Sequence, residues 1–163
     1  YLNTHLFRKI GIGNITWGTF SGCPRGCCSA RATAWQLAKL GTFLLDDGVY
    51  NGHRLLSSTA MRRISKYALT LSDDVFFSNP IMPLHRFQEK NYAWLWWLNR
   101  TGHILGNGVP RDAYFASGAR VNVLVVIPSR NAVVVRTASA RRLEQDFVHF
   151  QAAFVTAAVQ DLQ

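Results

Sequence analysis

The chain has 163 residues, of which 48% are hydrophobic, and it carries a formal net charge of +9. This length and this apolar content suit one domain with a real core, and no apolar run approaches the ~18 residues of a membrane span. The basic residues are spread out, without the blocks of a nucleic-acid-binding arm, so a solvated basic surface explains the charge better than a nucleic-acid partner. Because the chain begins with Tyr1 and not Met, we expect a preceding segment that was removed or belongs to another polypeptide.

The first half of the chain predicts helices and loops. Residues 1–12 have the pattern of the end of a helix, and residues 13–31, dense in Gly and Cys, predict a loop. Thr33 and Gln36 have the spacing of a capping box, which predicts a helix over residues 34–46 that ends at Gly48. Asn51-Gly52 is a turn signal, and Ser57 or Ser58 is the expected cap of a second helix that ends near residue 67.

Three cysteines gather in the first loop. Cys23, Cys27 and Cys28 are an odd number at close spacing, which is a poor disulfide framework. A metal site would need a further ligand, such as His5 or His53, and no standard ligand spacing supports one. We therefore favour structural thiols over a metal site, and we predict no metal and no cofactor. Such thiols suit a reducing compartment.

The second half predicts a sheet and a final helix. Residues 68–91 have mixed periods and two prolines, which favours a connecting loop over a lid across a cleft. The aromatic residues 92–99 predict one strand packed on a helix, in preference to a platform for sugars or bases. Residues 101–112 predict a loop. The apolar runs 121–127 and 132–136 flank a turn cluster, Pro128-Ser129-Arg130-Asn131, and predict an antiparallel hairpin covered on both faces, with residues 113–117 as a third strand.

The C-terminal segment predicts a helix that lies across this sheet. Its apolar residues recur every three or four positions, and its first turn carries acidic residues, as the helix dipole favours. The expected apolar face consists of Leu143, Phe147, Phe150, Phe154, Ala158 and Leu162. Its polar face is rich in Gln and not in Lys, which disfavours a membrane-surface helix. The predicted fold class is therefore α+β, with an antiparallel sheet flanked by helices.

Several motifs resemble one superfamily in the same order. Phe115-Ala116-Ser117-Gly118-Ala119, a strand, the Pro128 turn and Val133-Val134-Val135-Arg136 resemble the last conserved block of the serine β-lactamase-like hydrolases. That superfamily includes class C β-lactamases, penicillin-binding proteins, related esterases and 6-aminohexanoate-dimer hydrolases. Residues 6–12, 32–41, 44–57 and 92–97 add further agreement. The resemblance covers residues 6–138 and implies that residues 1–163 form the C-terminal portion of a β-lactamase/transpeptidase-like domain whose N-terminal portion is absent from this chain.

The resemblance implies a role for residues 116–120. In the family, an activated serine attacks a carbonyl to give an acyl-enzyme, and two backbone N–H groups hold the oxyanion. Ala116-Ser117-Gly118 is the counterpart of the family's Lys-Thr-Gly motif. The resemblance gives Ser117 the hydroxyl position facing the cleft, Gly118 the close approach of substrate, and Ala119 the oxyanion-binding N–H. Ala116 replaces the cation that recognises a substrate carboxylate, and Arg120 stands beside the oxyanion position, so these two are the candidate substrate-binding residues.

The other family motifs are missing. No Ser-x-x-Lys occurs, and Tyr1-Leu2-Asn3, the one Tyr-x-Asn, stands too close to the next family segment to be the second motif. We therefore expect this chain to be inactive alone. One hypothesis makes it part of a serine hydrolase for an ester, amide or lactam, with nucleophile and base on a missing segment or companion chain. The alternative makes it a catalytically inactive structural subunit of a larger protein or ribonucleoprotein assembly. A third interpretation, an unrelated α+β binding module, would leave the ordered motif matches unexplained.

A partner is expected under both main hypotheses. Without the N-terminal portion, the apolar strands at residues 121–127 and 133–135 would show an uncovered face or an open edge, and such surfaces aggregate or find a partner. We expect that partner to be the complementary half or another polypeptide. The basic, Arg-rich composition without disulfides is compatible with an organelle matrix, such as that of mitochondria, or with another reducing compartment.

Overall fold

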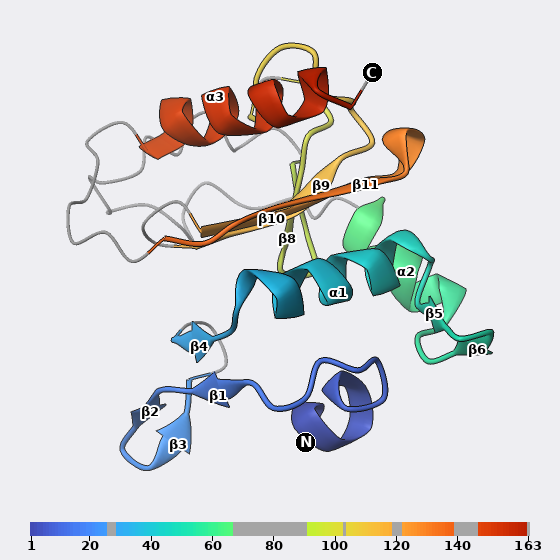
Figure 1. Ribbon diagram of the computed structural model, residues 1–163, viewed down its shortest axis with the longest axis vertical. Helices are drawn as coiled ribbons and strands as arrows, with labels where there is room; N and C mark the ends of the chain where they lie inside the picture. Colours follow the sequence, from blue (N-terminus) through green and yellow to red (C-terminus); the bar gives the residue numbers. More distant parts are fainter. Residues whose placement is uncertain (26–28, 67–90, 103, 119–121, 139–146, 163) are drawn as a thin grey trace.

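The computed structural model describes residues 1–25, 29–66, 91–102, 104–118, 122–138 and 147–162. These residues form layers that Figure 1 shows from the side. Helix α3 (Phe147–Gln160) covers one face of the main sheet, helix α1 (Ala34–Leu45) covers the other, and the N-terminal segment lies beyond α1. The α+β class with an antiparallel sheet between helices is thus confirmed.

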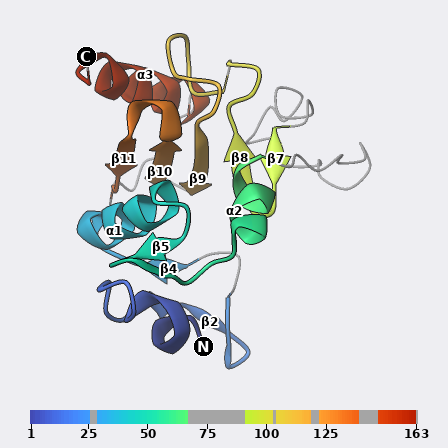
Figure 2. The same cartoon turned by 90° about the vertical axis from the view of Figure 1, so that its right-hand side faces the viewer.

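The main sheet has five antiparallel strands. Their spatial order is β11-β10-β9-β8-β7, as Figure 2 shows from left to right. The bounds are β7 (Tyr92–Ala93), β8 (Trp96–Leu98), β9 (Tyr114–Gly118), β10 (Asn122–Ile127) and β11 (Ala132–Arg136). The predicted hairpin is confirmed: Val126 pairs with Val133 across the turn, which is a 3₁₀ turn, η4 (Pro128–Arg130). Asn131 takes the left-handed conformation that closes this turn.

Both faces of the β10–β11 hairpin are covered, which is why these strands are apolar throughout. Residues 123–127 are all buried. Helix α1 approaches the sheet closely because Gly41 has no side chain: a methyl group there would lie 2.8 Å from Leu124 Cδ1 and would also meet Val133. We expected either an uncovered face or an open edge. In the described residues helices cover both faces, and β11 forms an open edge because it is the outermost strand of the sheet.

The caps predicted for the two helices of the first half are confirmed. The Thr33 hydroxyl accepts a hydrogen bond from the Gln36 backbone N–H, and Gln36 Oε1 accepts one from the Thr33 backbone N–H at 2.9 Å. Helix α2 (Ser58–Ser65) has Ser57 as its cap, 3.1 Å from the Ala60 nitrogen. The link between the helices is a small hairpin of β5 (Val49–Tyr50) and β6 (His53–Arg54).

The N-terminal segment is more ordered than the loop that we expected. It begins with the π-helical turn η1 (Asn3–Phe7), and residues 13–31 contain four two-residue strands: β1 (Thr16–Trp17), β2 (Thr19–Phe20), β3 (Cys23–Pro24) and β4 (Ala30–Arg31). Pairing of β1 with β4 and of β2 with β3 closes two short ribbons. These pairings are too brief for a periodic sequence pattern, so the prediction of a plain loop was wrong.

The single strand predicted over residues 92–99 is a hairpin instead. Tyr92 pairs with Trp97 and Ala93 with Trp96, so Trp94 and Leu95 form a two-residue turn. Leu95 has φ 63°, a left-handed conformation that sequence patterns assign to Gly or Asn. The aromatic run gave no sign of this turn, because neither turn residue belongs to the usual set. The expected packing on a helix is present, on α2.

The C-terminal helix lies across the sheet as expected, but its buried face differs from the predicted one. Gln151, Val155 and Val159 are buried against the sheet, while Phe150 and Leu162 are exposed. Phe150 instead packs against Arg136, whose guanidinium carbon lies 4.7 Å from the centroid of the Phe150 ring. Phe154 and Ala158 of the predicted face do pack, half-buried, against the same cluster, so the prediction is correct for these two residues. The expected connection at residues 68–90 and the expected first helical residues, 143–146, lie outside the described residues.

Candidate functional site

Ala116-Ser117-Gly118, the candidate counterpart of the Lys-Thr-Gly motif, lies at the end of the middle strand, β9. Successive side chains of a strand point to opposite faces of the sheet. Tyr114 packs in the cluster on the α1 side and Phe115 in the cluster on the α3 side. Ala116 therefore shares the α1 face with Tyr114, and Ser117 shares the α3 face with Phe115. Of the five site residues suggested by the sequence, Ala119 and Arg120 lie outside the described residues.

The Ser117 hydroxyl is engaged by a buried amide. Ser117 Oγ donates a hydrogen bond to Gln151 Oε1 at 2.7 Å. Gln151 lies on α3 and is only 4% exposed. The hydroxyl thus lies between the sheet and α3, whereas the resemblance implied a hydroxyl that faces a cleft. A buried amide oxygen costs free energy when it has no donor, so this bond holds Ser117 toward α3.

The backbone N–H and C=O groups of Ser117 point toward the β8 side of the strand, whereas its side chain points toward α3. The Asn99 N–H donates to the Ala113 carbonyl, so Ala113 directs its backbone groups toward β8. Alternate residues of a strand direct these groups to the same edge, so Ser117 does likewise. The register pairs Trp97 with Phe115, which places Trp96, the first residue of β8, opposite Ala116. Strand β9 therefore extends beyond β8, and its edge at Ser117 faces the turn instead of a paired strand.

Gly118 ends β9 opposite the first residue of β10. It pairs with Asn122 and is exposed, and a methyl group at Gly118 would meet only Asn122, at ordinary contact distance. Asn122 Oδ1 accepts a hydrogen bond from the Ala138 backbone N–H at 2.8 Å, which fixes the segment after β11 beside this end of the sheet. The end of β9 is thus a defined strand end with small side chains, which is what the close approach of a substrate requires.

The cysteine loop shows no metal centre in its described part. Cys23 is an exposed free thiol on β3, while Cys27 and Cys28 lie outside the described residues. No group of three or more His, Cys, Asp or Glu side chains comes together among the residues that the structure describes. The interpretation of Cys27 and Cys28 as structural thiols stays a prediction.

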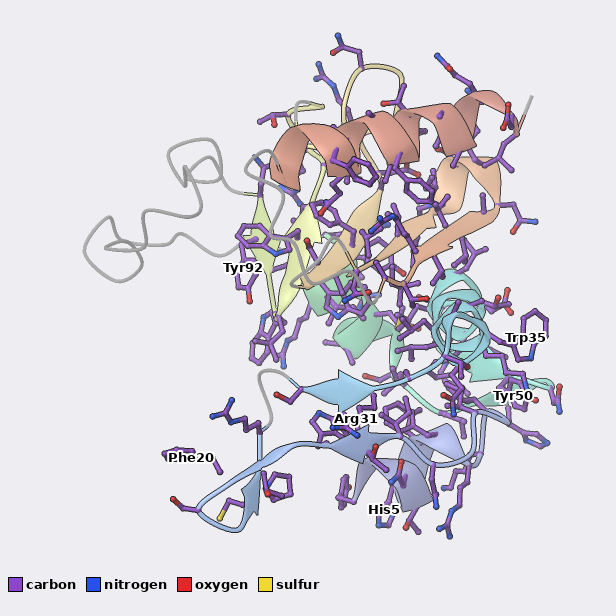
Figure 3. All side chains as sticks on the ribbon, turned by 60° about the vertical axis from the view of Figure 1, so that its left-hand side comes forward. His5, Phe20, Arg31, Trp35, Tyr50 and Tyr92 are labelled. Atoms are coloured by element: carbon purple, nitrogen blue, oxygen red, sulfur yellow. The ribbon has the colours of Figure 1, made fainter. Side chains whose placement is uncertain are left out.

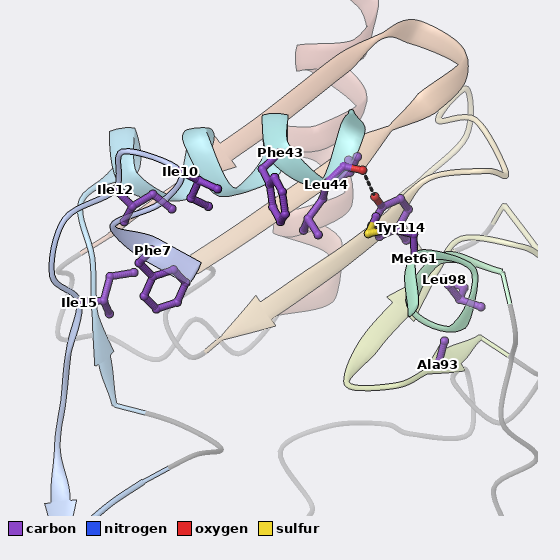
Figure 4. Packing of buried hydrophobic residues seen from close by; sticks show 11 residues of the cluster. Phe7, Ile10, Ile12, Ile15, Phe43, Leu44, Met61, Ala93, Leu98 and Tyr114 are labelled. Carbon is purple, nitrogen blue, oxygen red and sulfur yellow. Dashed lines mark hydrogen bonds between the residues drawn. The ribbon is translucent and has the colours of Figure 1, made fainter. Parts of the chain in front are cut away.

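Two tyrosines of the sheet are withdrawn from solvent: Tyr114 of β9 is buried and Tyr92 of β7 is half-buried. Burial, with a smaller contribution from the charge of Asp47, raises the pKa of Tyr114 far above its ordinary value. Its hydroxyl donates to the Leu44 carbonyl oxygen of α1 at 3.1 Å, as Figure 4 shows. Burial also raises the pKa of Tyr92. Both phenols are therefore neutral donors at physiological pH and are not general bases.

Two polar residues that sequence reasoning missed organise the surroundings of the site. Gln151 is one. The other is Asn99, whose amide nitrogen donates to the carbonyl oxygens of Val109 and Pro110, while its oxygen accepts from the Leu105 N–H. Asn99 is completely buried and fixes the loop that leads into β9. The sequence offers one signal for each residue, which is a polar side chain within a segment that is otherwise mostly apolar.

A scan against models of known protein families finds no match, and no curated protein matches the chain. In the part of the chain that the structure describes, no helix is both long and apolar enough to cross a bilayer.

Proposed function

We propose that this chain is the C-terminal part of a β-lactamase-type serine hydrolase and supplies the end of β9 to a nucleophile carried on another segment or companion chain. The observation that carries the proposal is the geometry of Ser117. Its backbone lies beyond the paired residues of β8 and faces the β7–β8 turn, beside the small residues Ala116 and Gly118. Such a strand end can pair with an extended acyl group, and the next backbone N–H groups can bind an oxyanion.

The arrangement of the sheet supports the same proposal. Strands β9, β10 and β11 follow each other as neighbours, with a helix on each face and the C-terminal helix crossing them, in the sequence order that the motif matches require. Strand β11 is left at the edge, and three consecutive valines make it suited to pair with a further strand. A companion segment would add there.

The reaction would run through an acyl-enzyme on the companion's serine. The serine oxygen attacks the substrate carbonyl carbon, and the carbonyl oxygen becomes an oxyanion held by backbone N–H groups, one of them from Ala119. The C–O or C–N bond then breaks as the leaving group takes a proton from the companion's base, and water releases the acyl group. Ala116 offers no cation, so the substrate would not be selected by a carboxylate next to the scissile bond.

A specific observation favours a second candidate function, that of an inactive structural subunit. The Ser117 hydroxyl donates to Gln151, so it is directed away from the α1 face. The Ser117 hydroxyl is bonded to a buried amide, and Ala116 replaces the lysine of the motif. Both features are expected of a protein that kept the fold and lost the reaction. The two candidates differ in one observable, which is a reactive serine in the purified material.

The test is labelling of the natively purified assembly with a fluorescent fluorophosphonate or penicillin, followed by a denaturing gel and mass spectrometry of every co-purifying chain. The hydrolase proposal expects label on a companion chain, at a serine within Ser-x-x-Lys. An unlabelled assembly with stoichiometric unrelated partners would support the structural subunit and reject the hydrolase.

Two variants assign the roles within β9. Ala119→Pro removes the backbone N–H and is expected to slow labelling by roughly 10²-fold or more, the usual cost of losing one oxyanion donor. Ser117→Ala keeps every backbone N–H and is expected to label within a few fold of the parent chain. Thr137→Pro, at an exposed position after β11, controls for the effect of a new proline on folding. Equal labelling of Ala119→Pro and the parent chain would reject the proposed oxyanion donor.

A further inference from the structure

The turn between β7 and β8 exposes two large apolar side chains. Trp94 is 52% and Leu95 is 81% exposed, although the strands on either side are largely buried. The turn projects from the end of the sheet where α2 lies, as Figure 2 shows for β7, β8 and α2. Met61 of α2 packs with Ala93 and Leu98 beneath it, so the hairpin is anchored and only its tip is free (Figure 4).

The backbone at the tip gives no reason for a leucine. Leu95 adopts φ 63°, a conformation that costs a leucine free energy and that Gly or Asn would adopt readily. An apolar side chain that is both strained and exposed contributes nothing to the core. Local strain of this kind is characteristic of functional positions. An exposed leucine in this conformation is therefore a candidate for contact with another molecule.

A cation lies against the tip. The Arg63 guanidinium lies 5.3 Å from the centroid of the Trp94 ring. Arg62 of α2 and Lys66, the residue that caps the C-terminus of α2, are also exposed. Neither α2 nor the β7–β8 hairpin contains an acidic residue. The tip therefore combines projecting apolar side chains with a positive field that no neighbour on these elements neutralises.

We propose that the β7–β8 tip, with Arg62 and Arg63 of α2 and Lys66 at its C-cap, docks on an anionic lipid surface. Leucine would enter the boundary of the acyl chains, tryptophan would lie at the headgroup level that its ring prefers, and the cations would meet lipid phosphates. A protein partner needs a much larger complementary patch, about 800 Å² on each side. A convex tip of two residues is too small for that, whereas a soft lipid surface accepts it.

The test is flotation of the natively purified chain with vesicles of phosphatidylcholine alone and of phosphatidylcholine mixed with phosphatidylserine. Binding is expected only to the anionic vesicles and should weaken with added salt. Leu95→Asn is the decisive variant, because asparagine accepts the left-handed turn while losing the apolar insertion. It should bind roughly tenfold more weakly. Arg63→Gln and Lys66→Gln should each lose about fivefold.

Matched variants elsewhere control for general stickiness and charge. Trp35→Ser removes a tryptophan that is more exposed than Trp94, 71% against 52%, at the start of α1 and on the side of the molecule away from Tyr92 of β7 (Figure 3). Arg130→Gln removes an exposed cation from the β10–β11 turn. Both should bind like the parent chain. Unchanged vesicle binding by Leu95→Asn would overturn the proposal. Binding of the chain to soluble poly-glutamate as tightly as to phosphatidylserine vesicles would overturn it in favour of an acidic protein partner.

Discussion

The two faces of the main sheet are held by different kinds of contact. On the α1 face, Gly41 brings the helix against Leu124 and Val133, and the contact is almost wholly apolar. On the α3 face, an apolar cluster is joined by a polar pair, the half-buried Ser117 and the buried Gln151. Apolar packing depends on volume, whereas a buried polar pair depends on both members. The α1 face should therefore respond to single changes of size, and the α3 face to changes made in pairs.

The largest effect is expected where the α1 face is tightest. Gly41→Leu would place a side chain where even a methyl group meets Val133 and Leu124, so helix or sheet must shift. We expect a loss of about 3 kcal/mol in the free energy of unfolding, measured by denaturant titration. Thr42→Leu places the same leucine side chain at the next, exposed position and should change stability by less than about 0.5 kcal/mol. A mild effect of Gly41→Leu would mean that this face is not close-packed.

The next largest effect is expected at a polar residue of the α3 side. Asn99→Ala would leave the Leu105 N–H and the carbonyl oxygens of Val109 and Pro110 without their partner, inside a loop that packs under α3. We expect a loss of about 2 to 3 kcal/mol. Hydrogen exchange should locate the loosening in residues 99–113. Asn107→Ala, at an exposed position of the same loop, is the control and should leave exchange unchanged.

The difference between the faces also explains what the sequence could and could not predict. The capping box at Thr33 and Gln36, the β10–β11 hairpin and the covered sheet follow from local chemistry and from an apolar pattern, and all were predicted correctly. The turn at Leu95 was missed because its residues are not turn formers. The hydrogen bond between Ser117 and Gln151 was not predicted either. It depends on a partner 34 residues away, which no local pattern contains.

A double-mutant cycle sharpens the comparison at the candidate site. Gln151→Ala leaves the Ser117 hydroxyl without its buried acceptor and should cost about 1 to 2 kcal/mol. Ser117→Ala leaves the Gln151 side-chain oxygen without its donor and should cost a similar amount. The double variant with Gln151→Met and Ser117→Ala removes both polar groups, so its cost should be clearly smaller than the sum of the two single changes. Additive costs from denaturant titrations would show that the bond contributes nothing to the α3 face.

The smallest effect is expected at the polar bond of the α1 face. Tyr114→Phe keeps the ring in place and removes only the hydroxyl that donates to the Leu44 carbonyl oxygen, so it should cost about 1 kcal/mol at neutral pH. Its effect on pH dependence is more informative. Burial raises the pKa of Tyr114 in the folded chain, so the unfolded chain gives up this proton first. The associated stability is complete below about pH 10, the ordinary tyrosine value, and is lost as the pH rises toward the folded-state pKa. Tyr114→Phe should flatten that alkaline loss in denaturant titrations, whereas Tyr1→Phe, at an exposed ring, should leave it unchanged. Burial also raises the pKa of Tyr92, so part of the alkaline loss should remain in Tyr114→Phe. A loss as large as that of the parent chain would mean that the Tyr114 phenol reaches solvent and that the α1 face opens more readily than its apolar packing implies.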